Sequence, residues 1–452
     1  MIVETAQPTA PPSPRPGTFG ARVAGLAAVR LLSVVAGFLT GVLGARLIGS
    51  DGLGAAGVAM TLGSIGAIVC NGGINISTIY LLGRRPEERH QIIAVLSTIA
   101  LVGALLGAVL LLVLGGAIAP AVGLEGREGL FLAAAALGAV MILFEFAGAI
   151  LLGLGRNRAY TLAELIRGVG TLVATALLLL SVWRSDAGFV VAAMIAQGAA
   201  TAFAVQRVVA VVGAVRPTLD GPIMGEAVGI GLRGQVGNVL QFLNLRLDQL
   251  LVPAFLSLSS AGVYLIAVRV SEALAQLGGA AGSLIFPEVA RQADPSATAV
   301  TERAVRVLTI MIVGVGLLIG LLAEVFLELA FGTEFAQGAL ALRILLVAML
   351  PLSIARILAG DLKGRGRAGL VSIAMGLAVV VTVVLDILLI PRFGIEGAAV
   401  ASVVAYTSTA LALAIAFVRL TGADGRDLIP RGSDVGAMIR YVARLRAGGM
   451  AS

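Results

Sequence analysis

The sequence is poor in the side chains that most enzymes use for chemistry. Among its 452 residues there is one cysteine, Cys70, and one histidine, His90. A single cysteine cannot form an intrachain disulfide. Structural zinc sites, haem ligation and most nucleophile–base pairs need more of these two residue types than the chain holds. We therefore expect neither a metal nor a cofactor, and we expect a protein that is not an enzyme.

Charged residues are also scarce, at 13% of the chain against 59% hydrophobic residues. Soluble domains carry roughly 25% charged residues. Apolar runs of about 20 residues recur along the chain, which is the length that crosses ~30 Å of hydrocarbon at about 1.5 Å per residue. The strands of membrane β-barrels alternate in polarity and are only ~10 residues long. The sequence therefore predicts an all-α polytopic membrane protein.

We expect about twelve transmembrane helices in two parallel six-helix lobes around a central cavity. The first lobe covers 21–213, a linker covers 214–224, and the second lobe covers 225–418. The helices are placed near 22–48, 55–82, 90–118, 128–153, 159–183, 187–213, 225–256, 260–288, 303–330, 336–359, 367–390 and 395–418.

An internal repeat supports the two lobes. The segment 155–159, Gly-Arg-Asn-Arg-Ala, matches 364–368, Gly-Arg-Gly-Arg-Ala, 209 residues later. At the same offset 188–192 matches 397–401, and at an offset of 208 the segment 54–56 matches 262–264. An even number of helices returns each half to the same side of the membrane, so the repeats are expected to be parallel and related by an axis along the membrane normal.

The basic residues give the expected orientation. The net charge is +7, and we attribute it to membrane orientation rather than to nucleic-acid binding, because the arginines gather in alternate loops. With the N-terminus inside a bacterial cytoplasmic (inner) membrane, the inside loops and tail hold most of them. These residues are Arg84, Arg85, Arg89, Arg156, Arg158, Arg216, Arg291, Lys363, Arg365, Arg367, Arg419, Arg426, Arg431, Arg440, Arg444 and Arg446.

Both termini are expected to be cytosolic. Residues 1–20 contain a proline-rich stretch typical of a disordered tail. In 419–452, apolar residues share one face at helical spacing with arginines off it. This pattern fits either an amphipathic helix lying on the anionic membrane surface or a solvated tail. The apolar residues are Val435, Met438, Ile439, Val442 and Leu445.

Several segments resemble the polysaccharide and oligosaccharide flippases (Wzx-like) of the multidrug/oligosaccharidyl-lipid/polysaccharide exporter superfamily. They are 243–251, 261–267, 45–54, the Gly-Arg-x-Arg-Ala loop and 391–399. The resemblance extends over about 20–418. It implies two six-helix bundles around a cavity that work by alternating access, and a polyprenyl-diphosphate-linked glycan as cargo. The implied partners are this glycan lipid, membrane lipids and the glycan polymerase machinery.

Two arginines are predicted to lie inside the membrane at matching places of the two halves. Arg30 lies ~12 Å inside the first helix, and Arg233 lies at a similar depth in the seventh. Ionisable groups in hydrocarbon are costly, so they usually face a cavity or a partner. Both arginines could bind the diphosphate of the cargo through bidentate hydrogen bonds. Both could instead extend their guanidinium groups to the membrane interface.

The helix near 225–256 carries a polar stripe. Arg233, Gln241, Asn244 and Asp248 fall within about 80° of one another, and Asn238 and Gln249 widen the arc to about 160°. The stripe is expected to line the cavity and bind sugar hydroxyls, because amides both donate and accept hydrogen bonds. Hydrogen bonding between helices within one lobe is the alternative.

Carboxylates in the predicted seventh and eleventh helices could couple transport to an ion. Asp248 and Asp386 could each take up a proton or a sodium ion, whereas Asp248 could also pair with Arg246. Arg269 is spaced to pair with Glu272 on the same helix or to line the cavity.

Two further features sit in the first lobe. Asn75 shares a face with Asn71 and Thr78 and could line the cavity or pack between helices. Glu164 and Arg167 are expected to form an ion pair along one helix, because they are spaced i,i+3.

Other classes of function fit the sequence less well. A cationic drug exporter of the same superfamily would want an acidic cavity, whereas the deep charges of the first lobe are mainly arginine. A major-facilitator carrier would have an Asp-Arg-x-Gly-Arg loop after the second helix, where this chain has Gly-Arg-Arg-Pro-Glu at 83–87. A membrane glycan ligase or polymerase would need a large outer loop with catalytic residues. A non-transporting scaffold would not need the repeat or the polar seventh helix.

Overall fold

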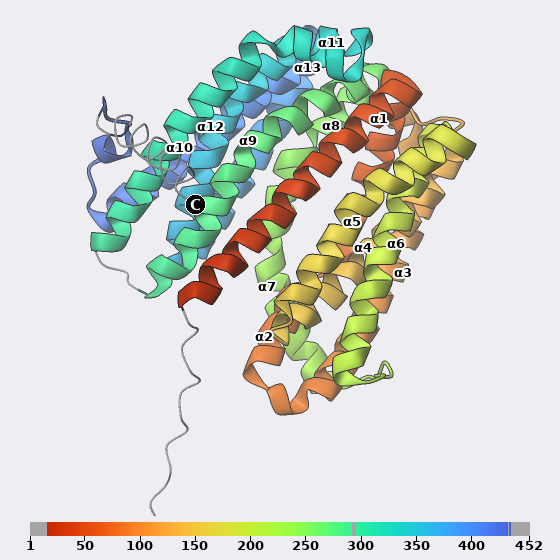
Figure 1. Cartoon of the computed structure of the whole chain (residues 1–452), viewed down its shortest axis with the longest axis vertical. Coiled ribbons are helices and arrows are strands. Elements are labelled where there is room, and N and C mark those ends of the chain that lie inside the picture. Colours follow the sequence, from red (N-terminus) through yellow and green to blue (C-terminus); the bar gives the residue numbers. More distant parts are fainter. Residues whose placement is uncertain (1–15, 292–294, 433, 435–452) are drawn as a thin grey trace, which may run out of the picture.

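The computed structural model describes residues 16–291, 295–432 and 434, and these residues form helices joined by short turns, with no strand among them. Helices α1–α6 make the first lobe (Figure 1). Their bounds are Pro16–Cys70, Ile74–Arg84, Arg89–Ala121, Glu128–Gly153, Asn157–Leu177 and Asp186–Val212. Short helical turns, η1 (Pro86–Glu88) and η2 (Leu178–Val182), follow α2 and α5.

Helices α7–α13 make the second lobe, with α1 and α7 lying between the two lobes in Figure 1. Their bounds are Gly221–Arg246, Asp248–Phe255, Leu258–Arg291, Pro295–Leu321, Ala323–Phe331, Ala339–Gly364 and Ala368–Thr421. The turns η3 (Thr333–Gly338) and η4 (Gly425–Leu428) complete the described elements. The predicted surface helix at 435–445 lies outside the described residues, as does the tail up to residue 15.

The twelve predicted crossings are present, and two labels each cover two successive crossings. α1 holds the first crossing and most of the second, which are separated by a kink at Gly49 with φ 70°, and α13 holds the last two, which are separated by a kink at Gly394 with φ 62°. A positive φ is accessible to glycine without steric cost. Conversely, Gly72 and Gly73 interrupt the second crossing, and residues 247 and 322 interrupt the seventh and ninth. Nine of the described helices are long and apolar enough to span a membrane.

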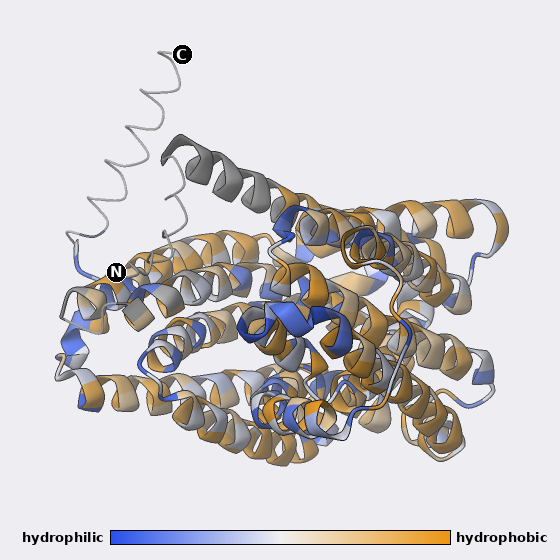
Figure 2. Cartoon of the chain, turned by 90° about the horizontal axis from the view of Figure 1, so that it is seen from below, coloured by the Kyte–Doolittle hydropathy of each residue, from blue (hydrophilic) through white to orange (hydrophobic). Residues whose placement is uncertain are grey.

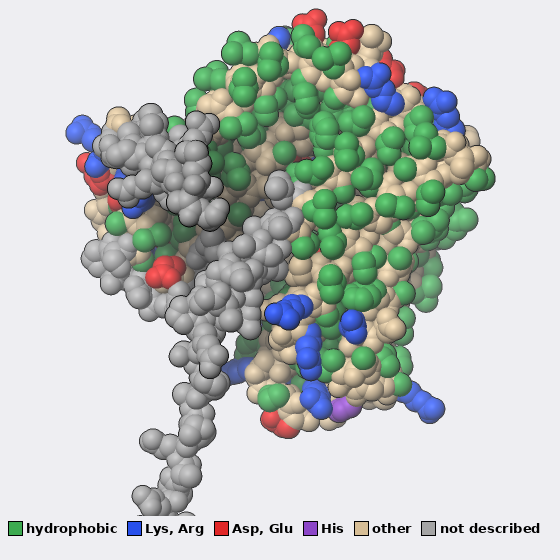
Figure 3. All heavy atoms as spheres, viewed as in Figure 1, with side chains coloured by type: hydrophobic (Ala, Val, Ile, Leu, Met, Phe, Trp, Pro, Cys, Tyr) green, Lys and Arg blue, Asp and Glu red, His purple; other side chains and the backbone are tan. Residues whose placement is uncertain are grey.

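The outer surface of the helix bundle suits a lipid environment. Figure 3 shows a belt of hydrophobic side chains with charged side chains gathered above and below it. Large apolar residues stand exposed in the middle of several helices, among them Leu105, Val113, Leu180 and Leu317. Figure 2 shows that most of the helical ribbon is hydrophobic, with hydrophilic residues in the turns and in short stretches of helix. The protein is therefore a multi-pass membrane protein.

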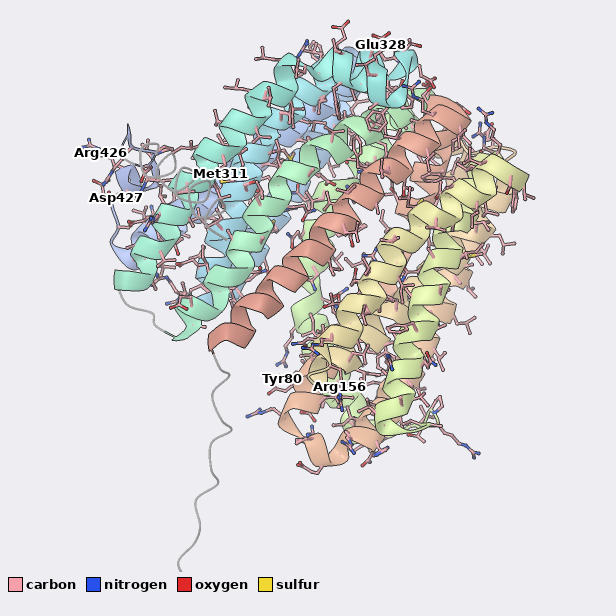
Figure 4. All side chains as sticks on the ribbon, viewed as in Figure 1. Tyr80, Arg156, Met311, Glu328, Arg426 and Asp427 are labelled. Carbon is pink, nitrogen blue, oxygen red and sulfur yellow. The ribbon has the colours of Figure 1, made fainter. Side chains whose placement is uncertain are left out.

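Helix alternation brings the arginine-rich loops of the first lobe to one end of the bundle. We call this the basic-loop end; it holds the turns after α2 and α4 and the linker between α6 and α7. Figure 4 labels Tyr80 and Arg156 there, and Glu328 at the opposite end. This alternation agrees with the asymmetry of charge that the sequence predicts.

The two lobes meet at the opposite end through repeat-related residues. The hydroxyl oxygens of Ser50 and Ser259, which lie 209 positions apart, are 2.6 Å from each other. Gly54 and Gly262, which are 208 positions apart, let α1 and α9 touch backbone to backbone, since an added Cβ on Gly54 would lie 1.8 Å from the Leu258 carbonyl oxygen. Residues related by a two-fold axis meet on that axis, so the contact places the pseudo-symmetry axis along the bundle.

Further hydrogen bonds seal this end. The Ser50 hydroxyl donates to a carboxylate oxygen of Glu334 at 2.7 Å, and the Ser50 amide donates to the other at 3.0 Å. Arg46 donates from Nε to the Ala330 carbonyl at 3.2 Å and also reaches the Leu329 carbonyl. Those carbonyls lie in the last turn of α11, where a cation complements the helix dipole. The lobes are thus closed at the end away from the basic loops.

Replacing Gly54 tests this closure. We expect Gly54→Ala to shift the protein away from the present conformation, because its Cβ would overlap the Leu258 carbonyl. Labelling of a cysteine placed near the sealed end should increase several-fold in rate. Gly37→Ala, on the same helix with open space around the added Cβ, should leave labelling unchanged. Equal labelling of both variants would show that the lobes do not close through this contact.

Candidate functional site

Four polar residues of the seventh crossing, Asn244, Arg246, Asp248 and Gln249, lie at the junction of α7 and α8. α7 ends at Arg246, and α8 begins at Asp248 and contains Pro253. The missing amide of proline cannot complete the helix hydrogen bonds, which favours a break in this region. Asp248 is buried and accepts a hydrogen bond of 2.7 Å from the Tyr264 hydroxyl on α9. The interruption thereby holds a carboxylate inside the second lobe.

Neighbouring side chains of α7 connect this region to two further helices, α9 and α13. Arg246 makes two hydrogen bonds, of 3.0 and 3.2 Å, to the carboxylate of Glu272 on α9. The Thr382 hydroxyl on α13 donates to the Asn244 amide oxygen at 2.9 Å. Interhelical hydrogen bonding thus accounts for part of the polar stripe.

Two amides of the same stripe reach α1 in the first lobe. The Gln235 side chain donates to the Ile68 carbonyl at 2.6 Å. The Gln249 amide oxygen accepts a hydrogen bond of 3.2 Å from Thr61, while its buried Nε2 has no partner among the described residues. The seventh crossing is therefore bonded to both lobes.

Asp386 has the most unusual surroundings of the predicted site residues. Its side chain is fully buried in α13, and neither carboxylate oxygen has a hydrogen-bond partner among the described residues. It interacts electrostatically with Asp248 and with the Tyr264 hydroxyl. Burying an unpaired carboxylate costs several kcal/mol, about 2–7 even for neutral polar groups. The pair of carboxylates is thus a place where a small cation or a proton would be stabilised.

Two arginines of the second lobe remain without partners. Among the described arginine side chains of α7–α9, Arg233 and Arg269 make neither a hydrogen bond nor an ion pair. The predicted pairing of Arg269 with Glu272 is wrong, because Glu272 binds Arg246 from the neighbouring helix instead. Arg269 is half-buried beside Gly41 of α1. Within the described residues, α7–α9 of the second lobe therefore hold two arginines without partners, and Arg269 is the one that lies beside the first lobe.

Arg233 lies on the side of α7 that faces away from the first lobe. Gly231 packs on the turn at Gly72 and Gly73, where an added Cβ on Gly73 would lie 2.1 Å from the Gly231 carbonyl oxygen. Two residues further along a helix, Arg233 points about 160° away from this contact. α7 begins at Gly221 rather than at 225, so Arg233 lies ~18 Å inside the helix, deeper than the sequence suggests. The side chain of its predicted counterpart, Arg30, lies outside the described part of the structure.

The remaining predicted residues are spread over both lobes. Asn238 donates to the Gln235 amide oxygen at 3.4 Å, and Gln241 is half-buried with no hydrogen bond to the described residues. Asn75 on α2 lies close to the Glu145 carboxylate on α4. The structure thus brings Asn244, Asp248 and Asp386 close to one another but places Asn75 in a separate cluster.

That cluster lies on α2, α4 and α5 of the first lobe. The Glu164–Arg167 ion pair predicted from the sequence is confirmed, with an oxygen-to-nitrogen distance of 2.5 Å. The Tyr160 hydroxyl donates to the other carboxylate oxygen of Glu164 at 3.2 Å. Glu145 interacts with both charges of the pair. This first-lobe cluster therefore combines acidic, phenolic, amide and guanidinium groups, whereas the second-lobe site combines arginines with the buried carboxylates of Asp248 and Asp386.

The basic-loop end carries a further contact between the first lobe and α7. Arg85 forms ion pairs with Glu226 on α7 and, at 3.2 Å, with Glu88. The hydrogen bond and charge of Glu226 hold the pKa of Arg85 above its ordinary value. Because Glu226 is exposed to solvent and Arg85 is only partly buried, screening keeps this ion pair weak. It can therefore break at little cost when α7 moves.

Sequence reasoning missed the side chains that organise the second-lobe site. Tyr264 is fully buried and holds Asp248, Glu272 neutralises Arg246, and Arg356 donates to the Ala275 carbonyl at 2.8 Å. Thr382 binds Asn244. A polar residue within an apolar run was the only available signal, and it does not identify the partner.

Comparison with known proteins points to one family. A family model described as polysaccharide biosynthesis protein matches residues 43–339. A curated relative from Haloferax volcanii, named a probable low-salt glycan biosynthesis flippase, is 27% identical over 164 residues. That alignment covers 35% of this chain and 35% of the relative, so the chain spans about a third of the curated relative it matches.

Solved structures show the same fold. The lipid II flippase MurJ in an inward closed conformation matches with a TM-score of 0.72 at 14% identity, over 86% of this chain and 87% of that one. An inward-facing multidrug resistance transporter of the MATE family, in the MOP superfamily, matches with a TM-score of 0.66 at 15% identity, over 87% and 94%. An outward-facing MATE structure matches with a TM-score of 0.56 at 13% identity, again over 87% and 94%. These likenesses show that the chain shares its fold with these proteins.

Proposed function

We propose that this chain, which belongs to the polysaccharide biosynthesis protein family, carries a lipid-linked oligosaccharide across the membrane by alternating access. The cargo would be a glycan attached through a diphosphate to a polyprenyl chain. The relative named a glycan biosynthesis flippase supports this choice over a drug. The closed end away from the basic loops supports a state that receives cargo from the basic-loop side.

The unpaired arginines carry the proposal. A diphosphate is bound best by cations that are not already ion-paired with a carboxylate. Arg233 and Arg269 meet that condition. We propose that they bind the diphosphate, together with Arg30. A guanidinium is well suited to this role, because its fork of donors matches phosphate oxygens. Asn238, Gln241, Asn244 and Asn75 would contact sugar hydroxyls, although Asn244 already binds Thr382.

Asp248 and Asp386 are proposed as the ion-coupling pair. A carboxylate buried without a partner binds a proton or a sodium ion favourably, since either neutralises its charge. Tyr264 would orient Asp248 through its hydrogen bond. Uptake of the ion in this part of the second lobe would alter the contacts of α13 with α7, which pass through Asn244 and Thr382.

The positive-inside rule places the basic-loop end in the cytosol. We propose a bacterial cytoplasmic membrane with both termini inside. The glycan lipid would then be received from the cytosolic leaflet and released on the outer side. Glycan polymerase machinery would be a partner there, because it would consume the delivered cargo.

Deletion of the gene in its host tests this function. We expect polyprenyl-diphosphate glycan to accumulate in the lipid fraction and surface polysaccharide to fall. Wild type should clear the glycan lipid, whereas Arg233→Ala should clear it about tenfold more slowly, because a hydrogen bond to a charged group is worth about 1.5–3 kcal/mol. Arg343→Ala is the control, since Arg343 is exposed on α12 and binds the Gly320 carbonyl.

Normal surface polysaccharide without glycan lipid in the deletion strain would contradict the proposed cargo. Drug or small-solute export on the same fold would then be the leading function. Equal clearance by Arg233→Ala and Arg343→Ala would instead show that Arg233 does not bind the cargo. The proposed identity of the cargo would then still stand.

A further inference from the structure

A pocket outside the central site lies where the two lobes are connected. It has a volume of about 310 Å³ and is formed by α3, α4, α6 and the linker between α6 and α7. From the linker, Gly213, Val215 and Pro217 line it. Its helical walls include Leu101 and Val205, both of which are exposed on the surface of the first lobe. The pocket is therefore open to the surrounding bilayer in its basic-loop half.

The lining of this pocket suits hydrocarbon. Two hydroxyl side chains, Ser97 and Thr201, belong to it. The Ser97 hydroxyl donates to the Ile93 carbonyl at 2.6 Å, and the Thr201 hydroxyl donates to the Gln197 carbonyl at 2.8 Å. Because both are engaged with their own helices, the wall offers a ligand little hydrogen bonding. An acyl chain fits such a wall, whereas a sugar would lose its hydrogen bonds to water.

The mouth of the pocket is basic. Arg89 begins α3 one helical turn before the lining residue Ile93, and Arg216 stands in the linker between Val215 and Pro217. Both arginines are exposed, and neither makes a hydrogen bond or an ion pair through its side chain with the described residues. An apolar pocket below free guanidinium groups is complementary to one kind of molecule, a lipid with an anionic headgroup.

The linker at this mouth is held by few bonds. The Thr218 amide donates to the Ala94 carbonyl at 3.2 Å, and the Thr98 hydroxyl donates to the Thr218 carbonyl at 2.8 Å. Asp220 accepts a hydrogen bond of 2.8 Å from Gln91 and caps the first turn of α7. A chain seated in the pocket would pack against the linker from the membrane side and hold it on α3.

We propose that this pocket binds an anionic glycerophospholipid of the surrounding membrane. One acyl chain fills the space between α3, α4 and α6, and the phosphate contacts Arg89 and Arg216. The bound lipid restrains the linker that joins the lobes. Membrane composition thereby adjusts how readily one lobe moves against the other, independently of the transported cargo.

Native mass spectrometry of the purified full-length protein tests the site. Protein from nanodiscs of phosphatidylglycerol or of phosphatidylcholine is delipidated mildly, and the lipid retained is counted. We expect retention of one phosphatidylglycerol in preference to phosphatidylcholine. The variant Arg89→Gln/Arg216→Gln should reduce that preference by about fivefold for each guanidinium removed. Arg156→Gln/Arg158→Gln, which removes two exposed arginines at the turn between α4 and α5 at the same end of the first lobe, is the charge-matched control (Figure 4).

A second variant tests the pocket itself. Val205→Trp should displace the lipid altogether, because Val205 lines the pocket and is 45% exposed. Val173→Trp on α5, at 50% exposed and outside the pocket lining, should retain it. Equal retention of both phospholipids, or retention of phosphatidylglycerol by Val205→Trp, would overturn the proposal. Loss of binding in the control variants as well would overturn it too, because the lipid would then be attracted by general charge or held elsewhere.

Discussion

Oxidation of the variant Ser50→Cys/Ser259→Cys, made with Cys70→Ala, is expected to stop transport. The two hydroxyl oxygens lie 2.6 Å apart, and a disulfide needs a sulfur separation of about 2.05 Å. A bond here would join the lobes at the end away from the basic loops. Alternating access requires that end to open, so transport should fall to the level of a strain without the protein.

Reduction should restore transport, because the disulfide is then broken while the substitutions remain. Each single cysteine variant controls for the substitution itself. Cys70→Ala removes the only natural cysteine, so a crosslinked species can arise only from the new pair. Full transport by protein shown to be crosslinked would mean that this end need not open. The rocking of one lobe against the other would then be the wrong mechanism.

Asp386→Asn is expected to make the protein more stable and less active. Its carboxylate is fully buried without a hydrogen-bond partner among the described residues, so removing the charge should raise the free energy of unfolding by about 1–3 kcal/mol. Transport driven by an ion gradient should fall about tenfold or more, since an amide cannot take up the ion. Thermal unfolding in detergent and transport with and without the gradient measure the two effects.

Asp361→Asn is the matched control. Asp361 is also fully buried, but its oxygens accept hydrogen bonds of 2.6 Å from Arg365 and 2.7 Å from Thr301. Breaking a buried pair leaves an unpaired charge, so this variant should be less stable by about 3–5 kcal/mol. If Asp386→Asn were also less stable and still responded to the gradient, Asp386 would be a structural residue and the proposed coupling would fail.

The number of crossings and the two lobes could be predicted because both follow from composition and repetition. The length of each apolar run of the sequence shows where a helix can span a bilayer. The repeat offset also pairs Ser50 with Ser259 and Gly54 with Gly262, which meet in the structure. The breaks at Gly49 and Gly394 agree with the sequence, which places gaps between successive helices at 48–55 and 390–395.

Side-chain pairing within the site was harder to predict, because neighbours in space are distant in sequence. Glu164 and Arg167 pair as their i,i+3 spacing suggests. Arg269 and Glu272 have the same spacing, yet Glu272 binds Arg246, 26 residues away. The geometry of a bidentate contact across two helices outweighs the local pair. The isolation of Asp386 could be seen only once the surrounding helices were in place.

Transfer of the lipid-linked glycan by the pure protein is the most direct measurement of the central claim. The protein would be reconstituted in liposomes with a polyprenyl-diphosphate oligosaccharide, and the share of glycan reached by an external glycosidase would be followed over time. We predict transfer by wild type, slower transfer by Arg233→Ala, and none by the oxidised Ser50→Cys/Ser259→Cys variant. Absence of glycan transfer by wild type, in liposomes where the same protein moves a cationic drug, would contradict the account.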